Sequence, residues 1–118
     1  MTINILGTEY TVTVKKYDEE EYFKEKNADG YCLAESHEIV ICDLSTFPEW
    51  EKEPDLVREA AQKHTIRHEI VHAFLNESGL RDSAGQYDTA WAKNEEMVDW
   101  FAIQGPKIYA AWKAAGAV

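Results

Sequence analysis

The chain has 118 residues, the size of one ordinary domain, and we expect residues 1–118 to fold as a single compact unit. Hydrophobic residues make up 45% of the chain and aromatic residues 12%, which is enough for a core and excludes a disordered protein. The 12 basic and 22 acidic residues give a net charge of -10, so non-specific binding to nucleic acid or to an acidic membrane surface is disfavoured.

Membrane and disulfide signals are absent from the pattern. No window approaches the roughly 18 consecutive apolar residues of a transmembrane helix, and the first residues lack the basic start of a signal peptide. We therefore expect a cytoplasmic protein that does not associate with membranes. Cys32 and Cys42 are too few for a secreted disulfide framework and have no metal-ligand spacing. Both are predicted to be free, partly buried thiols.

The first 43 residues carry strand signals. Ile3 and Ile5 alternate with polar residues before a turn at Gly7-Thr8, and the same alternation resumes at Val12 and Val14. Residues 31–35 and 38–43 predict two more strands, joined at Ser36-His37. Between the two pairs, Asp18 could cap a short charged helix over residues 19–26 that ends in a turn at residues 27–30.

The second half of the chain has a helical period. A long amphipathic helix is predicted from Pro54 to the stop at residues 76–79, and a second from an N-cap at Asp88 to about Gln104. Gly105-Pro106 is expected to break the chain before a last helix over residues 107–115 that packs back on the core. The predicted fold is therefore α+β, with a small, mostly antiparallel sheet of four short strands followed by three C-terminal helices.

The long helix contains the sequence His68-Glu69-Ile70-Val71-His72, an HExxH motif. Two histidines four residues apart lie on one face of a helix, so both imidazoles can reach one tetrahedral metal. Glu69 projects about 100° around the helix from His68, close enough to act on a water without being a ligand. The alternative interpretation is a pair of exposed histidines beside a capping-type glutamate. The apolar context argues against it, because unpaired ionisable groups are costly to bury.

The following helix offers a third ligand. Glu95 and Asp99 share a face, so one carboxylate can bind the metal while the other accepts the free ring N–H of a ligating histidine. Glu96 competes with Glu95, but its neighbour four residues on is Trp100, which cannot hold a histidine in this way. The alternative is that Glu95 and Asp99 simply form a solvated acidic face.

The pattern His68-Glu69-x-x-His72 followed by Asn94-Glu95-x-x-x-Asp99 resembles that of the gluzincin metallopeptidases. Because the chain is small, it is more similar to the minigluzincins and the compact ImmA/IrrE-type domains of phages and prophages. The resemblance covers residues 64–102 and implies a zincin-like fold holding one Zn²⁺ per chain. It implies three zinc ligands, His68, His72 and Glu95, with Glu69 as general base and acid and Asp99 as partner of His68. It also implies that an edge strand, for which residues 31–34 are the candidate, lines the bound peptide.

Some features of thermolysin-like enzymes have no obvious counterpart here. We expect no counterpart of the downstream substrate-binding domain in this chain, so cleavage specificity does not carry over from the resemblance. Tyr87, His37 and His64 could each donate to an oxyanion, Tyr87 being the candidate we retain. For all three a structural role is the favoured interpretation, as a loop anchor, a turn residue and a helix-surface histidine respectively. The four tryptophans are interpreted as core or interface aromatics.

These observations predict a zinc-dependent metallopeptidase acting on a peptide or protein substrate through a metal-activated water. Two alternatives remain at this level. One is a catalytically silent binding or regulatory module of the same fold, stabilised by zinc. The other is a helical interaction domain that binds no metal and carries the motif by chance.

Overall fold

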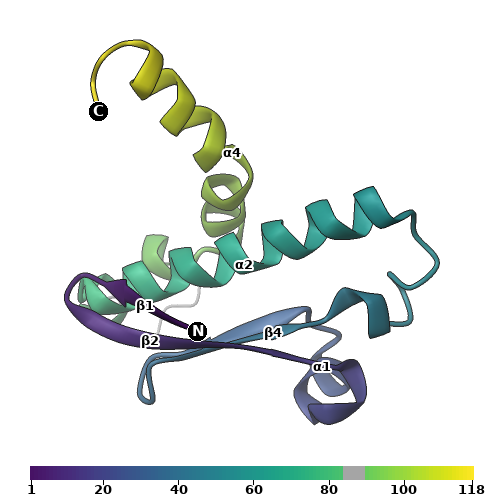
Figure 1. Ribbon diagram of the computed structural model, residues 1–118. Coiled ribbons are helices and arrows are strands. Elements are labelled where there is room, and N and C mark those ends of the chain that lie inside the picture. Colours follow the sequence, from purple (N-terminus) through teal and green to yellow (C-terminus); the bar gives the residue numbers. More distant parts are fainter. Residues whose placement is uncertain (84–89) are drawn as a thin grey trace.

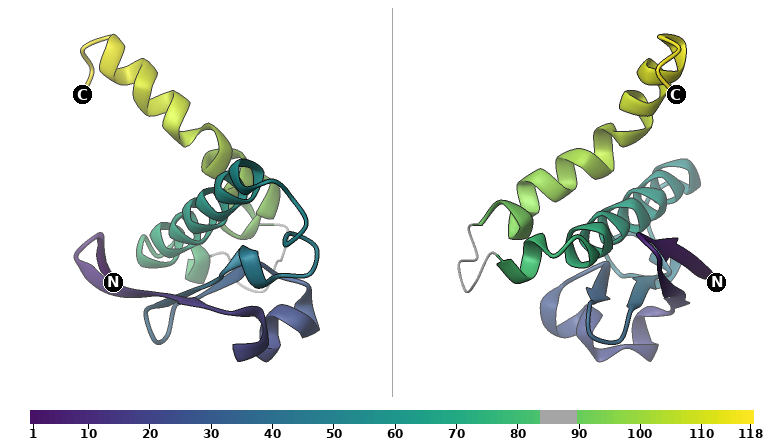
Figure 2. Two further views of the ribbon diagram at one scale, coloured as in Figure 1. Left: turned by 45° about the vertical axis from the view of Figure 1, so that its right-hand side comes forward. Right: turned by 90° about the vertical axis from the view of Figure 1, so that its left-hand side faces the viewer.

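The computed structural model describes residues 1–83 and 90–118 and has an α+β fold (Figure 1). The strands are β1 (Thr2–Ile5), β2 (Thr8–Lys15), β3 (Gly30–Leu33) and β4 (Glu38–Cys42). The helices are α1 (Glu21–Lys26), α2 (Asp55–Glu77), α3 (Leu80–Ser83) and α4 (Glu95–Ala114), and 3-10 turns occupy Tyr17–Glu19, Leu44–Thr46 and Trp91–Lys93. Helix α2 lies across one face of the sheet, and α4 leaves the body of the molecule beyond it (Figures 1 and 2).

The sheet has the strand order β1-β2-β4-β3 and is mixed. The outer pairs, β1 with β2 and β3 with β4, are antiparallel as predicted, but the central pair, β2 with β4, is parallel. The prediction of a mostly antiparallel sheet missed this pair because it assumed that each strand pairs with the next. The chain between β2 and β4 passes through α1 and β3, and a crossover of this length allows parallel pairing.

The first hairpin is a tight two-residue turn. Ile5 pairs with Thr8, and the intervening Leu6 and Gly7 have positive φ values of 51° and 93°. Positive φ at both central residues is the requirement of a type I′ turn, whose twist suits a hairpin.

The predicted N-cap at Asp18 is wrong: Asp18 lies inside the 3-10 turn, and α1 begins at Glu21 after an extended Glu20.

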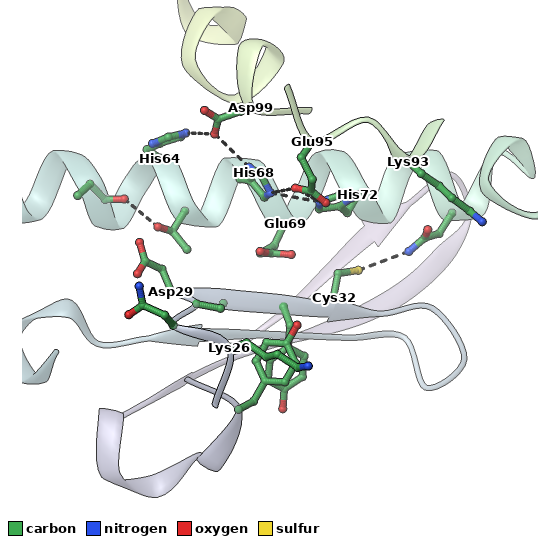
Figure 3. A pocket seen from close by; sticks show the side chains of 18 of the residues that line it. Lys26, Asp29, Cys32, His64, His68, Glu69, His72, Lys93, Glu95 and Asp99 are labelled. Carbon is green, nitrogen blue, oxygen red and sulfur yellow. Dashed lines mark hydrogen bonds and ion pairs between the residues drawn. The ribbon is translucent and has the colours of Figure 1, made fainter. Parts of the chain in front are cut away.

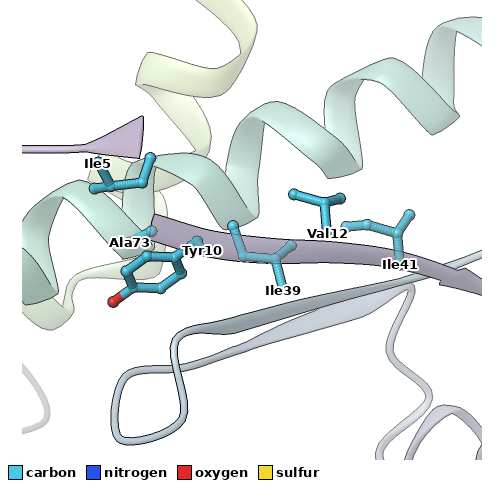
Figure 4. Close-up of a cluster of buried hydrophobic side chains, with 6 residues drawn as sticks. All are labelled: Ile5, Tyr10, Val12, Ile39, Ile41 and Ala73. Carbon is cyan, nitrogen blue, oxygen red and sulfur yellow. The ribbon is translucent and has the colours of Figure 1, made fainter. Parts of the chain in front are cut away.

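The core forms on both faces of β4. Residues Ile39 and Ile41 face α2, where they join the cluster Ile5, Tyr10, Val12 and Ala73 (Figure 4). The alternate residues Val40 and Cys42 join Phe23, Leu44 and Phe47 in a second cluster. Because both faces of β4 are buried, its sequence is a continuous run of apolar residues and does not alternate between apolar and polar residues.

Helix α2 is connected to the sheet and to the turn after it by Gln62, in the first half of the helix, and by Glu77, its last residue. The Gln62 side chain accepts a hydrogen bond from the Leu44 N–H at 2.9 Å and donates to the Cys42 carbonyl at 2.8 Å. Glu77 accepts from the hydroxyls of Thr8 and Tyr10, both at 2.8 Å. These contacts fix the distance between the sheet and the middle of the helix, which carries the HExxH motif.

Helix α4 corrects three predictions. Asp88 lies outside the described residues, and the helix begins at Glu95 with Asn94 as N-cap, whose side chain accepts from the Met97 N–H at 2.8 Å. It continues through Gly105-Pro106 to Ala114 instead of breaking there. Its last turns project away from the body (Figure 2), with Trp112 53% exposed, so this segment does not pack back on the core.

The tryptophans divide between the two predicted roles. Among the described residues, Trp50 is partly buried against a core cluster. Trp91, Trp100 and Trp112 are exposed and are not core residues, so for them an interface role stays a prediction. Among the described residues, no helix combines the length and the apolar character that crossing a membrane requires.

Both cysteines are free, with Cys42 buried and Cys32 partly buried, as predicted.

Candidate metal centre

The centre is built from one stripe of α2 and the first two turns of α4. His64, His68 and His72 are spaced four residues apart, so their side chains lie on one face of α2 (Figure 3). Glu95 and Asp99 have the same spacing on α4 and approach that face from above (Figure 3). The small apolar cluster Leu75, Ala92 and Val98 packs the two helices together beside the polar groups.

Three ligand atoms form a nearly equilateral triangle. The Nε2 atoms of His68 and His72 lie 3.1 Å apart, and Glu95 Oε2 is 3.0 Å from the first and 3.3 Å from the second. Zinc bonds of about 2.0–2.1 Å at tetrahedral angles set ligand atoms about 3.3 Å apart. The donor set of two imidazoles and one carboxylate is also one that catalytic zinc prefers. The residues present therefore fit a zinc ion, and these groups could hold a metal ion.

The triangle is open on one side. Among the described side chains, no fourth histidine, cysteine, aspartate or glutamate joins the group of His68, His72 and Glu95. Structural zinc sites have four protein ligands, whereas catalytic sites have three and leave a position for water or substrate. Three protein ligands from the described residues would leave one position of a tetrahedral ion for another group.

Asp99 holds the other side of the His68 ring. Its Oδ1 atom lies 3.1 Å from His68 Nδ1 and 2.6 Å from His64 Nε2. Burial works to raise the pKa of Asp99, but hydrogen bonds from the two histidines outweigh it and hold that pKa below the ordinary value. The carboxylate therefore stays charged, and a charged acceptor at Nδ1 leaves the His68 Nε2 lone pair free for a metal.

A second group that could hold a metal consists of His64, His68 and Asp99. It shares His68 with the first group but would use the opposite ring nitrogen, Nδ1. A neutral imidazole has only one unprotonated nitrogen, so it can serve one of the two groups at a time. The His68, His72 and Glu95 group keeps the hydrogen bond to Asp99 intact, and we take it as the candidate metal centre.

Glu69 is buried beside the triangle. Its residue is only 7% exposed, and its carboxylate points from α2 toward the sheet, into the cavity (Figure 3). Burial raises the pKa of Glu69 to about 7; the charge of His68 opposes this rise, and that of Glu95 adds to it. A carboxyl group with a pKa near neutrality can both accept and release a proton at physiological pH.

Burial lowers the pKa of His72, which favours the neutral imidazole that a metal binds. Cys32 also lines the cavity, but burial and the negative charge of Glu69 raise the pKa of its thiol to about 12. The thiol therefore remains protonated, and a protonated thiol is a poor metal ligand.

The cavity is a groove of about 960 Å³ between α2 and β3. Strand β3 pairs with β4 on one side, and as the last strand in the sheet order it leaves its other edge without a strand partner in the described part of the chain. Gly30 permits the close approach of this strand, because a Cβ there would lie 2.9 Å from the Val40 carbonyl and 3.3 Å from Thr65. Residues 30–32 of β3 line the groove.

The structure brings together His68, Glu69, His72, Glu95 and Asp99, all of which the sequence pattern singles out. Glu96, the competing ligand, is exposed and belongs to neither group. Tyr87, the candidate oxyanion donor, lies outside the described residues. His37 lies away from the groove, with its Nε2 3.6 Å from Glu77.

His64 is the residue that sequence reasoning underrated. A surface role was favoured for it, yet it lines the groove and contacts Asp99. Its spacing of four residues from His68 was the available signal.

Comparisons with protein-family models, with curated proteins and with solved structures found no match to this chain.

Proposed function

We propose that this protein is a zinc-dependent peptide hydrolase with a zincin-like fold. The observation that supports it most directly is the open triangle of His68, His72 and Glu95 ligand atoms, 3.0–3.3 Å apart, with the buried Glu69 carboxylate beside it. Two aromatic nitrogens and a carboxylate at these spacings suit zinc, and an open position suits catalysis. Its resemblance to the gluzincin pattern supports the same activity.

In this proposal some residues bind the metal and others transfer protons. When bound, zinc would polarise the scissile carbonyl and acidify a water. Glu69 would take a proton from the attacking water on its carboxylate and return it to the nitrogen of the leaving amine. Its raised pKa, caused chiefly by burial, suits a group that must both accept and release that proton. Asp99 would keep His68 in the tautomer that binds metal through Nε2.

The groove suggests how a peptide would bind. An extended peptide can add to a free strand edge through main-chain hydrogen bonds, and β3 offers such an edge along the same groove as Glu69. This placement is close to the residues 31–34 expected from the sequence. The substrate class we propose is therefore an unfolded segment or flexible peptide rather than a helix.

Metal content tests the first half of the proposal. We expect elemental mass spectrometry of untagged protein to find about one zinc per chain, and His72→Ala and Glu95→Gln to lose it. Glu96→Gln is the matched control, because Glu96 is exposed on the same turn of α4 and belongs to neither candidate group. Equal zinc loss in Glu95→Gln and Glu96→Gln would contradict the assigned ligand set.

The Glu69→Gln variant tests the second half. It should keep zinc and lose peptide hydrolysis by at least about 10²-fold, because general acid–base catalysis contributes about 10²–10⁴-fold. Hydrolysis can be followed by mass spectrometry of a degenerate peptide library incubated with the zinc-loaded protein. A Glu69→Gln variant as active as the wild type would refute this role. A zinc-loaded protein that binds library peptides without cleaving them would instead identify the silent binding module.

A further inference from the structure

The stripe of histidines on α2 extends one turn beyond the HExxH motif. His64 lies four residues before His68, and its ring nitrogen Nε2 is 2.6 Å from Asp99 Oδ1. The same oxygen lies 3.1 Å from His68 Nδ1. One carboxylate oxygen thus contacts two imidazoles from successive turns of α2, and the contact to His64 is the shorter one.

This arrangement matters because Asp99 is otherwise weakly held. Its side chain is 43% exposed, so water competes for the carboxylate and lets it rotate. The His64 side chain is 34% exposed and that of His68 20%, so the two donors are better shielded than the acceptor. Two donors that meet one oxygen from different positions restrict the rotation of the carboxylate more than a single donor does.

We propose that His64 is a positioning residue for the metal centre: it anchors Asp99 so that Asp99 holds His68 with its proton on Nδ1 and its Nε2 directed at the metal. The inference rests on the proposed zinc site. Among the described residues, His64 does not belong to the group of His68, His72 and Glu95, and its side-chain hydrogen bond is to Asp99, through which it acts. Groups that orient a ligand in this indirect way commonly change metal affinity by about 10–100-fold.

A purely structural role is the rival explanation, since His64 joins α2 to α4. Arg67 provides the matched control for that role, because its Nε donates to the Ala102 carbonyl and so also joins the two helices. Arg67 does not contact Asp99 in the hydrogen bonds of the described residues. A variant that only loosens the helix pair should therefore behave like Arg67→Leu.

Three variants separate these roles. His64→Leu removes the donor while keeping a bulky side chain, and His64→Gln keeps a side-chain N–H that can donate to Asp99. Zinc affinity is measured by competition with a chelator of known affinity, and urea unfolding shows whether each variant is folded. We expect His64→Leu to bind zinc about tenfold more weakly, with His64→Gln within about threefold of wild type and Arg67→Leu unchanged.

A second measurement reports on the tautomer directly. Nitrogen-15 NMR of the metal-free protein distinguishes a protonated Nδ1 from a protonated Nε2, and the chain has only four histidines to assign. Because Glu95 also faces His68 Nε2 at 3.0 Å, the comparison between variants carries the result. The fraction of His68 protonated on Nδ1 should match the wild type in His64→Gln and in Arg67→Leu, and should fall in His64→Leu. Loss of packing alone would not move this signal.

The outcomes are distinct. Unchanged zinc affinity and unchanged His68 tautomer in a folded His64→Leu variant would overturn the positioning role. Loss of a second, weaker zinc equivalent, with the first unaffected, would overturn it too and would identify His64 as a metal ligand instead. A wild-type protein that binds no zinc would defeat the proposed function itself, a result that the metal titration of the wild type shows separately.

Discussion

Glu69 shows how burial, as the largest of several effects, can change the protonation of a side chain. The residue is 7% exposed, and removing its carboxylate from water raises the pKa to about 7. A carboxylate of ordinary pKa would be a weaker base, and a group of much higher pKa would hold its proton throughout the working pH range. The position on α2, turned toward the sheet, is what brings about this burial.

The raised pKa has a consequence for stability that can be measured without substrate. In metal-free protein the folded state binds a proton at Glu69 up to about pH 7, whereas the unfolded chain releases it near the ordinary glutamate pKa of 4.5. The folded state therefore holds more protons between these values, and the free energy of unfolding falls as pH rises through the window. A shift of this size corresponds to roughly 3 kcal/mol.

Glu69→Gln isolates this effect, because its amide does not titrate. We expect the variant to become more stable relative to wild type by up to roughly 3 kcal/mol between about pH 4.5 and 7.5, measured by urea unfolding with chelator present. The lowered pKa of His72, caused chiefly by burial, acts with the opposite sign, and it cancels largely when the two proteins are compared. A difference in stability that does not change with pH would show that Glu69 titrates normally.

Among the elements, α4 depends on a contact with α2 that compensates for its proline. Pro106 has no N–H to donate to the carbonyl of Ala102, four residues earlier, which is the acceptor an unbroken helix would use. Arg67 on α2 donates its Nε–H to that carbonyl. The helix can therefore continue past a residue that normally ends one, because the acceptor left over is occupied from outside.

A double-mutant cycle tests this compensation. Arg67→Leu should cost about 1–3 kcal/mol of unfolding free energy, because the carbonyl of Ala102, a residue 1% exposed, loses its side-chain donor. In a Pro106→Ala background the backbone N–H returns, so the same substitution should cost less than about 1 kcal/mol. Urea unfolding of the four proteins gives the coupling energy. Equal costs in both backgrounds would show that Arg67 does not compensate for Pro106.

On the scale of the whole molecule, the candidate metal centre lies where two differently built halves meet. The sheet and α2 share a continuous core, whereas α4 is joined to α2 by a small apolar cluster and by the polar groups around His68. Much of the attachment of α4 therefore consists of charged and titratable side chains. A metal ion bound by ligands from both helices would add to this attachment.

Metal removal should therefore destabilise the protein measurably. At free zinc about 100 times the Kd, linkage stabilises the folded state by about 2.7 kcal/mol, which corresponds to a rise in Tm of roughly 10 °C for a domain of this size. Scanning calorimetry with zinc and with excess chelator measures the difference, and His72→Ala should show none of it. A wild-type Tm that is the same in both conditions would favour the third interpretation of the sequence, a helical domain that binds no metal.

The sequence by itself determined the long helix, the shared face of its motif histidines and the shared face of Glu95 and Asp99. Helical periodicity fixes which residues of one element lie on the same face. It also located the four strands to within a few residues. These features are local, and they depend on spacing along the chain rather than on where distant segments lie.

Only the tertiary structure decided the parallel pairing of β2 with β4, the uninterrupted course of α4 past Pro106 and the contact of His64 with Asp99. Each depends on how segments far apart in the chain are placed. Strand order follows from where α1 and β3 pack, the carbonyl of Ala102 is occupied by a side chain 35 residues away, and the role of His64 follows from the position of α4 over α2. Periodicity within one element carries no information on the relative placement of two elements, and that placement assembles the candidate site.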